Sequence, residues 1–145
     1  MEVKVKRLNQ NAVLPTYGTE YSAGADLYNL DVEDVEIQPH KTVLIHTGIA
    51  MEIPVGFVGL IFARSGIATK KGLAPANKVG VIDSDYRGEI MVALHNHSDV
   101  TAKIERGERV AQICITPFLK AEFSEVEELN DTERGFGGFG STGAK

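Results

Sequence analysis

The chain has 145 residues, a formal net charge of −5 and one cysteine, Cys114. This length suits a single domain with a real core, and the acidic balance without a long basic run argues against a nucleic-acid coat protein. One cysteine excludes an internal disulfide and a cysteine-based metal site, and no apolar segment is long enough to span a bilayer. The N-terminus has no signal-peptide pattern, so we expect a soluble, intracellular and cytoplasmic protein.

Short strands separated by turns are predicted along most of the chain. Alternating or β-branched apolar residues carry this prediction, while Gly and Pro clusters mark the turns between them. Regular strand spacing with one short helix is typical of an all-β sandwich or barrel. The predicted strands cover residues 3–8, 35–37, 42–53, 57–62, 88–97 and a last segment from Arg109 to Pro117, with a further apolar-charged alternation over 118–129.

The one predicted helix covers residues 67–72, with Ser65 as its N-cap and Gly72 as its C-terminal stop. Arg64 directly precedes the N-cap. Free backbone N–H groups at a helix start, next to a guanidinium, form an anion site. The alternative is an ordinary cap beside a surface arginine.

Residues 80–88, with the sequence G-V-I-D-S-D-Y-R-G, are predicted to form the tip of a β-hairpin. The tip carries Asp83, Asp85, Tyr86 and Arg87, which is more chemistry than a turn requires. The alternative is a solvated turn with a cross-strand Asp–Arg pair.

Four further polar residues attract attention. Asp26 is a lone carboxylate among small residues, and turn capping is its ordinary role. His95 and His97 share one strand face, but no third ligand has convincing spacing, so surface or interface histidines are favoured over a metal site. Gln112 lies in an apolar strand and needs a hydrogen-bond partner if it is buried.

The last sixteen residues differ in composition from the rest, and we expect a core domain over 1–129 and an arm over 130–145. Five glycines lie among the ten residues 134–143, a density that does not hold regular structure alone. One interpretation is a disordered tail. The other is an arm that closes over a ligand, binding phosphate through glycine N–H groups and stacking an aromatic ring on a base.

Five stretches together resemble the motifs of the trimeric dUTP diphosphatase (dUTPase) family. The resemblance implies a jelly-roll-like β fold, hydrolysis of dUTP to dUMP and pyrophosphate with Mg²⁺, and a homotrimer whose three active sites lie between subunits. Each site would be covered by a C-terminal arm. The stretches are A-G-A-D-L at 23–27, A-R-S-G at 63–66, G-V-I-D-S-D-Y-R-G at 80–88, G-E-R-V-A-Q at 107–112 and R-G-F-G-G-F-G-S-T-G at 134–143.

The resemblance assigns the nucleoside contacts and the catalytic carboxylate to the third motif and its flanks. Asp83 matches the carboxylate that holds the water attacking the α-phosphorus. Tyr86 matches the residue packed on the deoxyribose, where a 2′-hydroxyl would clash. The contacts to the uracil edge fall on Asn77 and the backbone of Val81 and Ile82, with a further backbone contact at Met91.

The phosphate contacts fall on the other four motifs. Asp26 matches the carboxylate that reaches Mg²⁺ through water, and Phe139 matches the ring stacked on uracil, with Phe136 as the alternative ring. The phosphate-binding residues would be Arg64, Ser65, Gly66, Gln112, Arg134, Gly140, Ser141 and Thr142.

One departure from the family pattern is Ala63, which stands where the second motif often has proline. Two other functions stay open at this point. A dCTP deaminase of the same fold is disfavoured by the Tyr86 pattern and the complete arm. A regulatory module that senses dUTP is disfavoured by the intact Asp83.

Overall fold

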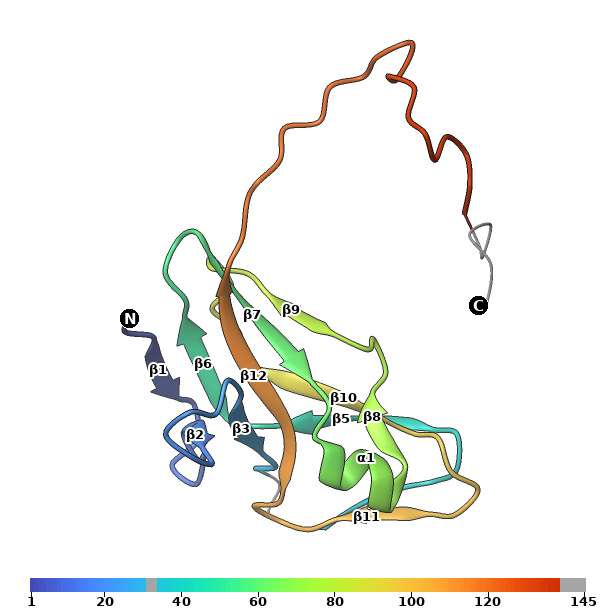
Figure 1. Ribbon diagram of the computed structural model, residues 1–145. Coiled ribbons are helices and arrows are strands. Elements are labelled where there is room, and N and C mark those ends of the chain that lie inside the picture. The colour runs from blue at the N-terminus through green and yellow to red at the C-terminus, as the bar shows by residue number, and fades with distance from the viewer. Residues whose placement is uncertain (31–33, 139–145) are drawn as a thin grey trace.

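The computed structural model describes residues 1–30 and 34–138, which hold twelve strands and one short helix (Figure 1). The all-β prediction is therefore confirmed. The elements are β1 (Lys4–Arg7), β2 (Thr16–Tyr17), β3 (Ala25–Tyr28), β4 (Val35–Ile37), β5 (Thr42–His46), β6 (Ile49–Glu52), β7 (Phe57–Phe62), α1 (Ser65–Lys71), β8 (Leu73–Pro75), β9 (Gly80–Ile82), β10 (Met91–Asn96), β11 (Ala102–Ile104) and β12 (Arg109–Pro117).

The strands pair antiparallel in four sheets. The largest has the order β2-β3-β12-β7-β9, so the long strand β12 lies at its centre and β9 at one edge. A three-stranded sheet has the order β5-β10-β8, and two-stranded sheets join β1 to β6 and β4 to β11. Within the described ranges these sheets do not close into one barrel.

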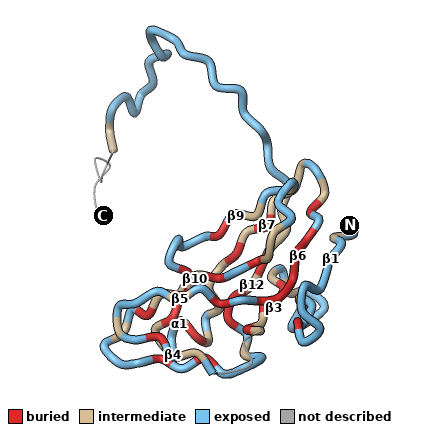
Figure 2. Tube along the Cα trace, turned by 180° about the vertical axis from the view of Figure 1, so that it is seen from behind, coloured by how far each residue is buried: buried red, intermediate tan, exposed pale blue. Residues whose placement is uncertain are grey.

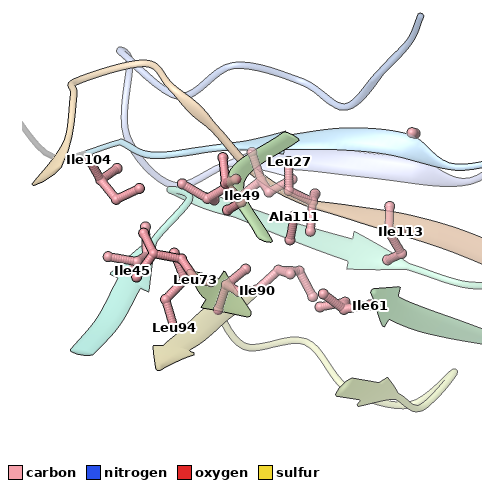
Figure 3. Packing of buried hydrophobic residues seen from close by; sticks show 14 of the residues in the cluster. Leu27, Ile45, Ile49, Ile61, Leu73, Ile90, Leu94, Ile104, Ala111 and Ile113 are labelled. Atoms are coloured by element: carbon pink, nitrogen blue, oxygen red, sulfur yellow. The ribbon is translucent and has the colours of Figure 1, made fainter. Parts of the chain in front are cut away.

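The core lies between the sheets and consists of aliphatic side chains. Figure 2 shows that the buried residues lie in the body of the protein and not in the segment after β12. Along β10, Val92, Leu94 and Asn96 are buried and alternate with residues that are more exposed, as strand alternation requires. Figure 3 shows Ile45, Leu73 and Leu94 gathered at one end of this core. Each fully buried side chain of this size stabilises the fold by about 1.5–3 kcal/mol.

The single strand predicted over residues 42–53 is wrong, because the chain bends at Thr47 and Gly48. β5 pairs with β10, whereas β6 pairs with β1 in another sheet. Gly48 has a φ of +69°, and a Cβ there would collide with the Leu30 side chain. β-branched composition predicts extended backbone on both sides of such a bend but does not locate it.

The hairpin predicted around residues 80–88 is right in its arms, since β8 before it and β10 after it pair antiparallel, but wrong in its tip, where residues 80–82 form the strand β9. β9 pairs with β7, while β10 pairs with β5 and β8. The segment between β9 and β10, residues 83–90, therefore connects two sheets. We call residues 83–88 the tip.

The helix prediction is confirmed, although its cap differs. Arg64, not Ser65, takes the N-cap position with extended backbone, and its side chain makes no capping bond. Gly72 ends the helix in the left-handed conformation, as predicted.

The chain leaves the body of the protein after β12 (Figure 1). Residues 118–138 contain no helix or strand, so the alternation over 118–129 does not form a strand within this chain. Leu119 and Phe123 are 97% and 95% exposed there. Apolar side chains this exposed are unusual on a segment that stays in water.

Candidate active site

Six of the predicted site residues line one cavity of about 310 Å³ beside the tip, which we call the tip pocket. It lies between β9 and β10, with Ile61 of β7 and Leu44 of β5 among its other lining residues. The structure thus brings together the residues assigned to the nucleoside: Asn77, Val81, Ile82, Asp83, Tyr86 and Met91.

β9 presents an open backbone edge at this pocket. One edge of the strand pairs with β7, and the other has no strand partner in the described part of the chain. Gly80 lets the strand lie close to β7, since a Cβ there would be 3.2 Å from that of Ile61. Asn77 precedes the strand in a turn where Lys78 has a φ of +66°. Free amide and carbonyl groups beside a side-chain amide suit the edge of a planar base.

The tip is held by Arg87 rather than by a salt bridge. Its guanidinium donates to the carbonyl oxygens of Ser84, at 2.6 Å, and Tyr86, at 2.9 Å. Asp83 and Asp85 make no ion pair within the described residues, so the cross-strand Asp–Arg pair is absent there. The Asp83 carboxylate is thus exposed at the pocket wall and free to accept a hydrogen bond from water.

Tyr86 lines the tip pocket and is held by two hydrogen bonds, one from its backbone and one from its ring hydroxyl. Its backbone N–H donates to the Asp83 carbonyl at 3.2 Å, and its hydroxyl donates to the Glu89 carbonyl at 3.0 Å. Gly88 is required beneath the ring, because a Cβ at that position would collide with the phenol. Gly88 and Glu89 therefore both help to hold the ring in place.

A second cavity, of about 400 Å³, lies between β3, β12 and the start of α1; we call it the arginine pocket. It contains the predicted residues Asp26, Arg64, Ser65 and Gln112, together with Arg109 and Cys114. Its lining carries two guanidinium groups and one carboxylate, a net charge of +1. This charge favours an anionic ligand.

Asp26 is the centre of the arginine pocket. It is only 7% exposed, and its two carboxylate oxygens accept from Arg64 Nε at 2.6 Å and Arg109 Nη1 at 3.2 Å. The remaining guanidinium N–H groups of both arginines make no hydrogen bond within the described residues. A buried carboxylate that fixes two arginines and leaves donors free is a suitable frame for binding phosphate.

Gln112 is fixed by its neighbours on two sides. Its side-chain amide donates to the Ala63 carbonyl at 2.9 Å, which is the partner that its place in an apolar strand required. Gly24 packs directly against it, since a Cβ there would lie 2.5 Å from Gln112 Oε1. The glycine of the A-G-A-D-L stretch therefore makes room for the glutamine of the G-E-R-V-A-Q stretch.

Sequence reasoning missed Arg109, although it lies within the fourth motif. Arg109 and Gln112 are three residues apart, and regular alternation would place them on opposite faces of β12. A β-bulge between Arg109 and Ala111 shifts the register, so that both side chains line the same pocket. The sequence pattern does not show the bulge, so the place of Arg109 in this pocket is known only from the structure.

The two pockets share no lining residue. Ile61 lines the tip pocket and Phe62 lines the arginine pocket, and consecutive strand residues point to opposite faces of a sheet. Within one chain, β7 therefore separates the groups assigned to the nucleoside from those assigned to the phosphates.

The remaining predicted site residues lie outside both pockets. Gly66 follows Ser65 in α1 and is half-buried. Arg134 lies on the projecting segment, where its Nε donates to the Gly137 carbonyl at 2.8 Å. Phe139, Gly140, Ser141 and Thr142 lie outside the described residues.

The paired histidines lie against each other. The rings of His95 and His97 meet edge to face, with centroids 4.5 Å apart. Desolvation by neighbouring atoms, and then the nearby His95, lower the pKa of the exposed His97 below its usual value. Residues 1–30 and 34–138 contain no cluster of three His, Cys, Asp or Glu side chains able to hold a metal ion.

No helix in the described ranges is long and apolar enough to cross a membrane.

The fold and its pockets define a class of small β proteins that bind nucleotides, with backbone edges for a base and arginines for phosphates. Comparison with known families shows to which family of this class the chain belongs. The model of the dUTPase family matches residues 10–143. The chain belongs to the dUTPase family.

Known relatives cover the whole chain. A deoxyuridine 5'-triphosphate nucleotidohydrolase from Nautilia profundicola is 53% identical over 143 residues, 99% of each chain. One from Hydrogenobaculum is 50% identical over all 145 residues. The Staphylococcus bacteriophage 80alpha dUTPase G164S mutant, solved with dUpNHpp, has a TM-score of 0.89 at 31% identity and covers 98% of both chains. A phage phi11 dUTPase mutant, at a TM-score of 0.78 and 28% identity over 88% of this chain and 98% of that one, is described as coordinating a structural Mg(II) ion.

Proposed function

We propose that this protein hydrolyses dUTP to dUMP and pyrophosphate with Mg²⁺ as its cofactor. Family membership and relatives named for this reaction support the proposal. The observation that carries it is the pair of complementary pockets. One offers a backbone edge, an anchored tyrosine and a free carboxylate, and the other offers arginines arranged around a buried aspartate.

The separation of these pockets supports a site shared between copies of the chain. One dUTP molecule needs both pockets, yet the sheet at β7 divides them within one subunit. We propose that the tip pocket of one subunit faces the arginine pocket of another in a homotrimer. A C-terminal arm would then cover the site, which agrees with the projecting segment after β12 (Figure 1).

In the proposed mechanism, the tip pocket selects the nucleoside. The free edge of β9, at Val81 and Ile82, with Asn77 and the Met91 backbone, would hydrogen-bond the uracil edge. A different base would cover these groups and leave them unpaired, at a cost of about 1–3 kcal/mol each. Tyr86 would pack on the deoxyribose and leave no space for a 2′-hydroxyl.

Asp83 would act as the general base. Its carboxylate would accept a proton from a water molecule as that water's oxygen bonds to the α-phosphorus. The bond from the α-phosphorus to the bridging oxygen then breaks, and the bridging oxygen leaves with pyrophosphate. The exposed carboxylate at the pocket wall has the open side that a bound water requires.

The arginine pocket would hold the triphosphate. Arg64, Arg109, Ser65 and Gln112 line it, and Gly66 would add its backbone N–H. Negative charge on the leaving pyrophosphate grows during the reaction, so fixed guanidinium groups stabilise the transition state. From the arm, Phe139 would stack on uracil, and the phosphate contacts would come from Arg134, Gly140, Ser141 and Thr142.

The residues present fit a Mg²⁺ ion bound mainly by the substrate. Mg²⁺ prefers phosphate oxygens and retained waters, so it does not need a cluster of protein ligands. Bound in this way, it would withdraw charge from the triphosphate, with Asp26 contacting one of its waters.

The direct test is pyrophosphate release with Mg²⁺ from dUTP, dCTP, dTTP and UTP in parallel, with the nucleotide products identified. We expect release from dUTP alone, giving dUMP. Uracil nucleotides formed from dCTP would instead indicate a deaminase. Tight dUTP binding without turnover would indicate the sensor function.

Arg109 gives a second prediction. Changing Arg109→Gln removes one guanidinium from the arginine pocket and leaves Asp26 paired with Arg64. We expect kcat/KM for dUTP to fall about 10- to 100-fold, since a charge-assisted contact contributes about 1.5–3 kcal/mol. Steady-state kinetics of Arg106→Gln, an exposed arginine outside both pockets, serve as the control. Equal losses in both variants would contradict a phosphate role for Arg109.

A further inference from the structure

Glu89, at the end of the segment that follows the tip, makes an unusual set of contacts. Its carboxylate accepts from the Gly48 backbone N–H at 2.8 Å through Oε1. Oε2 lies 2.9 Å from Nδ1 of His46. The side chain is largely buried, at 22% exposure, and it lines the tip pocket. Neither composition nor motif assigned it a role.

The backbone beside Glu89 is fastened to the same bend. Thr47 Oγ1 donates to the Ile90 carbonyl at 2.5 Å, and the Ile90 N–H donates to the Ile49 carbonyl at 2.8 Å. Thr47 and Ile90 are almost fully buried, so these bonds are shielded from water. Residues 46–49, which we call the bend, therefore form a rigid base for the end of the connecting segment.

Tyr86 depends on this base through one hydrogen bond. Its hydroxyl donates to the carbonyl of Glu89, the residue whose side chain is tied to the bend. The tyrosine is 41% exposed, so burial alone does not fix its ring. The position of the ring is set by its bond to Glu89 and by its close packing on Gly88.

We propose that Glu89 is a positioning residue that sets the preference of this enzyme for deoxyribose over ribose. By tying its own backbone to the bend, Glu89 holds the Tyr86 ring at one height over the sugar. A ring held in this way rejects a 2′-hydroxyl, whereas a ring free to move by a fraction of an ångström admits it. This inference rests on the proposed hydrolysis of dUTP.

Two features distinguish this role from general stabilisation. Among the described residues the Glu89 carboxylate forms its hydrogen bonds with the bend, whereas its main-chain carbonyl accepts from the tyrosine, so its effect on the substrate passes through Tyr86. The carboxylate also accepts a backbone N–H that has no other acceptor among the described residues. Removal of the carboxylate detaches Glu89 from the bend and thereby loosens the ring that its carbonyl holds.

The experiment compares kcat/KM for dUTP and for UTP, both with Mg²⁺, in the wild-type protein and four variants. Glu89→Ala should lower the dUTP-to-UTP ratio about tenfold, mainly through a higher KM for dUTP and a gain with UTP. Glu89→Gln keeps an oxygen for the Gly48 N–H and should retain most of the ratio. His46→Ala, at an exposed position, should lower it about threefold. The matched control is Glu52→Gln, an exposed carboxylate on β6 that pairs with Lys4.

The outcomes separate this inference from the proposed function. A wild-type protein that does not release pyrophosphate from dUTP contradicts the proposed function. An active wild type, with Glu89→Ala and His46→Ala reduced in melting temperature but unchanged in the dUTP-to-UTP ratio, overturns the positioning role. If Glu89→Ala does not fold, His46→Ala decides the question alone: an unchanged ratio overturns the inference, and a lowered ratio supports it.

Discussion

Changing Asp83→Asn is expected to reduce dUTP turnover about 10³-fold while nucleotide binding is retained, because proton transfer by a positioned base contributes about 10²–10⁴-fold. The amide has nearly the shape of the carboxylate, so the tip and the tip pocket stay intact. It does not accept a proton from the attacking water. Loss of kcat with little change in affinity is the signature of a group that acts only in the transition state.

The tip provides its own control for this experiment. Asp85 is also an exposed carboxylate between Ser84 and Tyr86, but it does not line the tip pocket. Asp85→Asn makes the same change in charge two residues away and should leave turnover within about twofold of wild type. Single-turnover kinetics and binding of a non-hydrolysable dUTP analogue measure both effects. Turnover that survives in Asp83→Asn, or an equal loss in Asp85→Asn, would contradict the general-base role.

The strands themselves were largely predictable, because strand formation leaves a local pattern. β7 and β12 were recognised as short apolar runs and β10 by its alternation, and Pro117 ends β12 as expected. Gly72 ends the helix for an equally local reason. Each of these features depends on residues that are close neighbours in the sequence.

Strand pairing was predictable only in part, because much of it depends on residues far apart in the chain. The apolar residues on either side of residues 80–88 predicted a hairpin, and β8 does pair with β10, but β9 lies inside the predicted tip and pairs with β7 in another sheet. The bend at Gly48 is similar, since Leu30 makes glycine necessary there. Alternation shows which face of a strand is buried, but it does not show what covers that face.

For the candidate site, too, the residues were predictable from the sequence but their arrangement in space was not. The motifs supplied the residues of both pockets, and the resemblance supplied their expected roles. They did not show that the two sets lie on opposite faces of β7, nor that a bulge adds Arg109 to Gln112 and Asp26. They also gave no reason to choose Glu89, whose contacts with the bend depend on the tertiary fold.

A mixture of two inactive variants should recover activity. Asp83→Asn removes the general base from the tip pocket and leaves the arginine pocket unchanged, whereas Arg64→Gln removes a guanidinium from the arginine pocket and leaves the tip pocket unchanged. Each variant alone should be nearly inactive. If each site takes its tip pocket and its arginine pocket from different subunits, co-refolding equal amounts creates sites in which both halves are unmodified.

Random assembly of these two chains places an intact tip pocket against an intact arginine pocket at about one interface in four, so about a quarter of wild-type turnover should return. A site contained within one chain predicts no recovery, because every subunit then carries one damaged half. The measurement is pyrophosphate release before and after co-refolding, with mixed assembly checked by light scattering and by a tag on one variant. Mixed oligomers without recovered turnover would contradict the shared site, and so would a mass equal to that of one chain. Recovery near a quarter would explain why a single subunit separates the nucleoside groups from the phosphate groups by a sheet: neither half can act until a second copy brings the other.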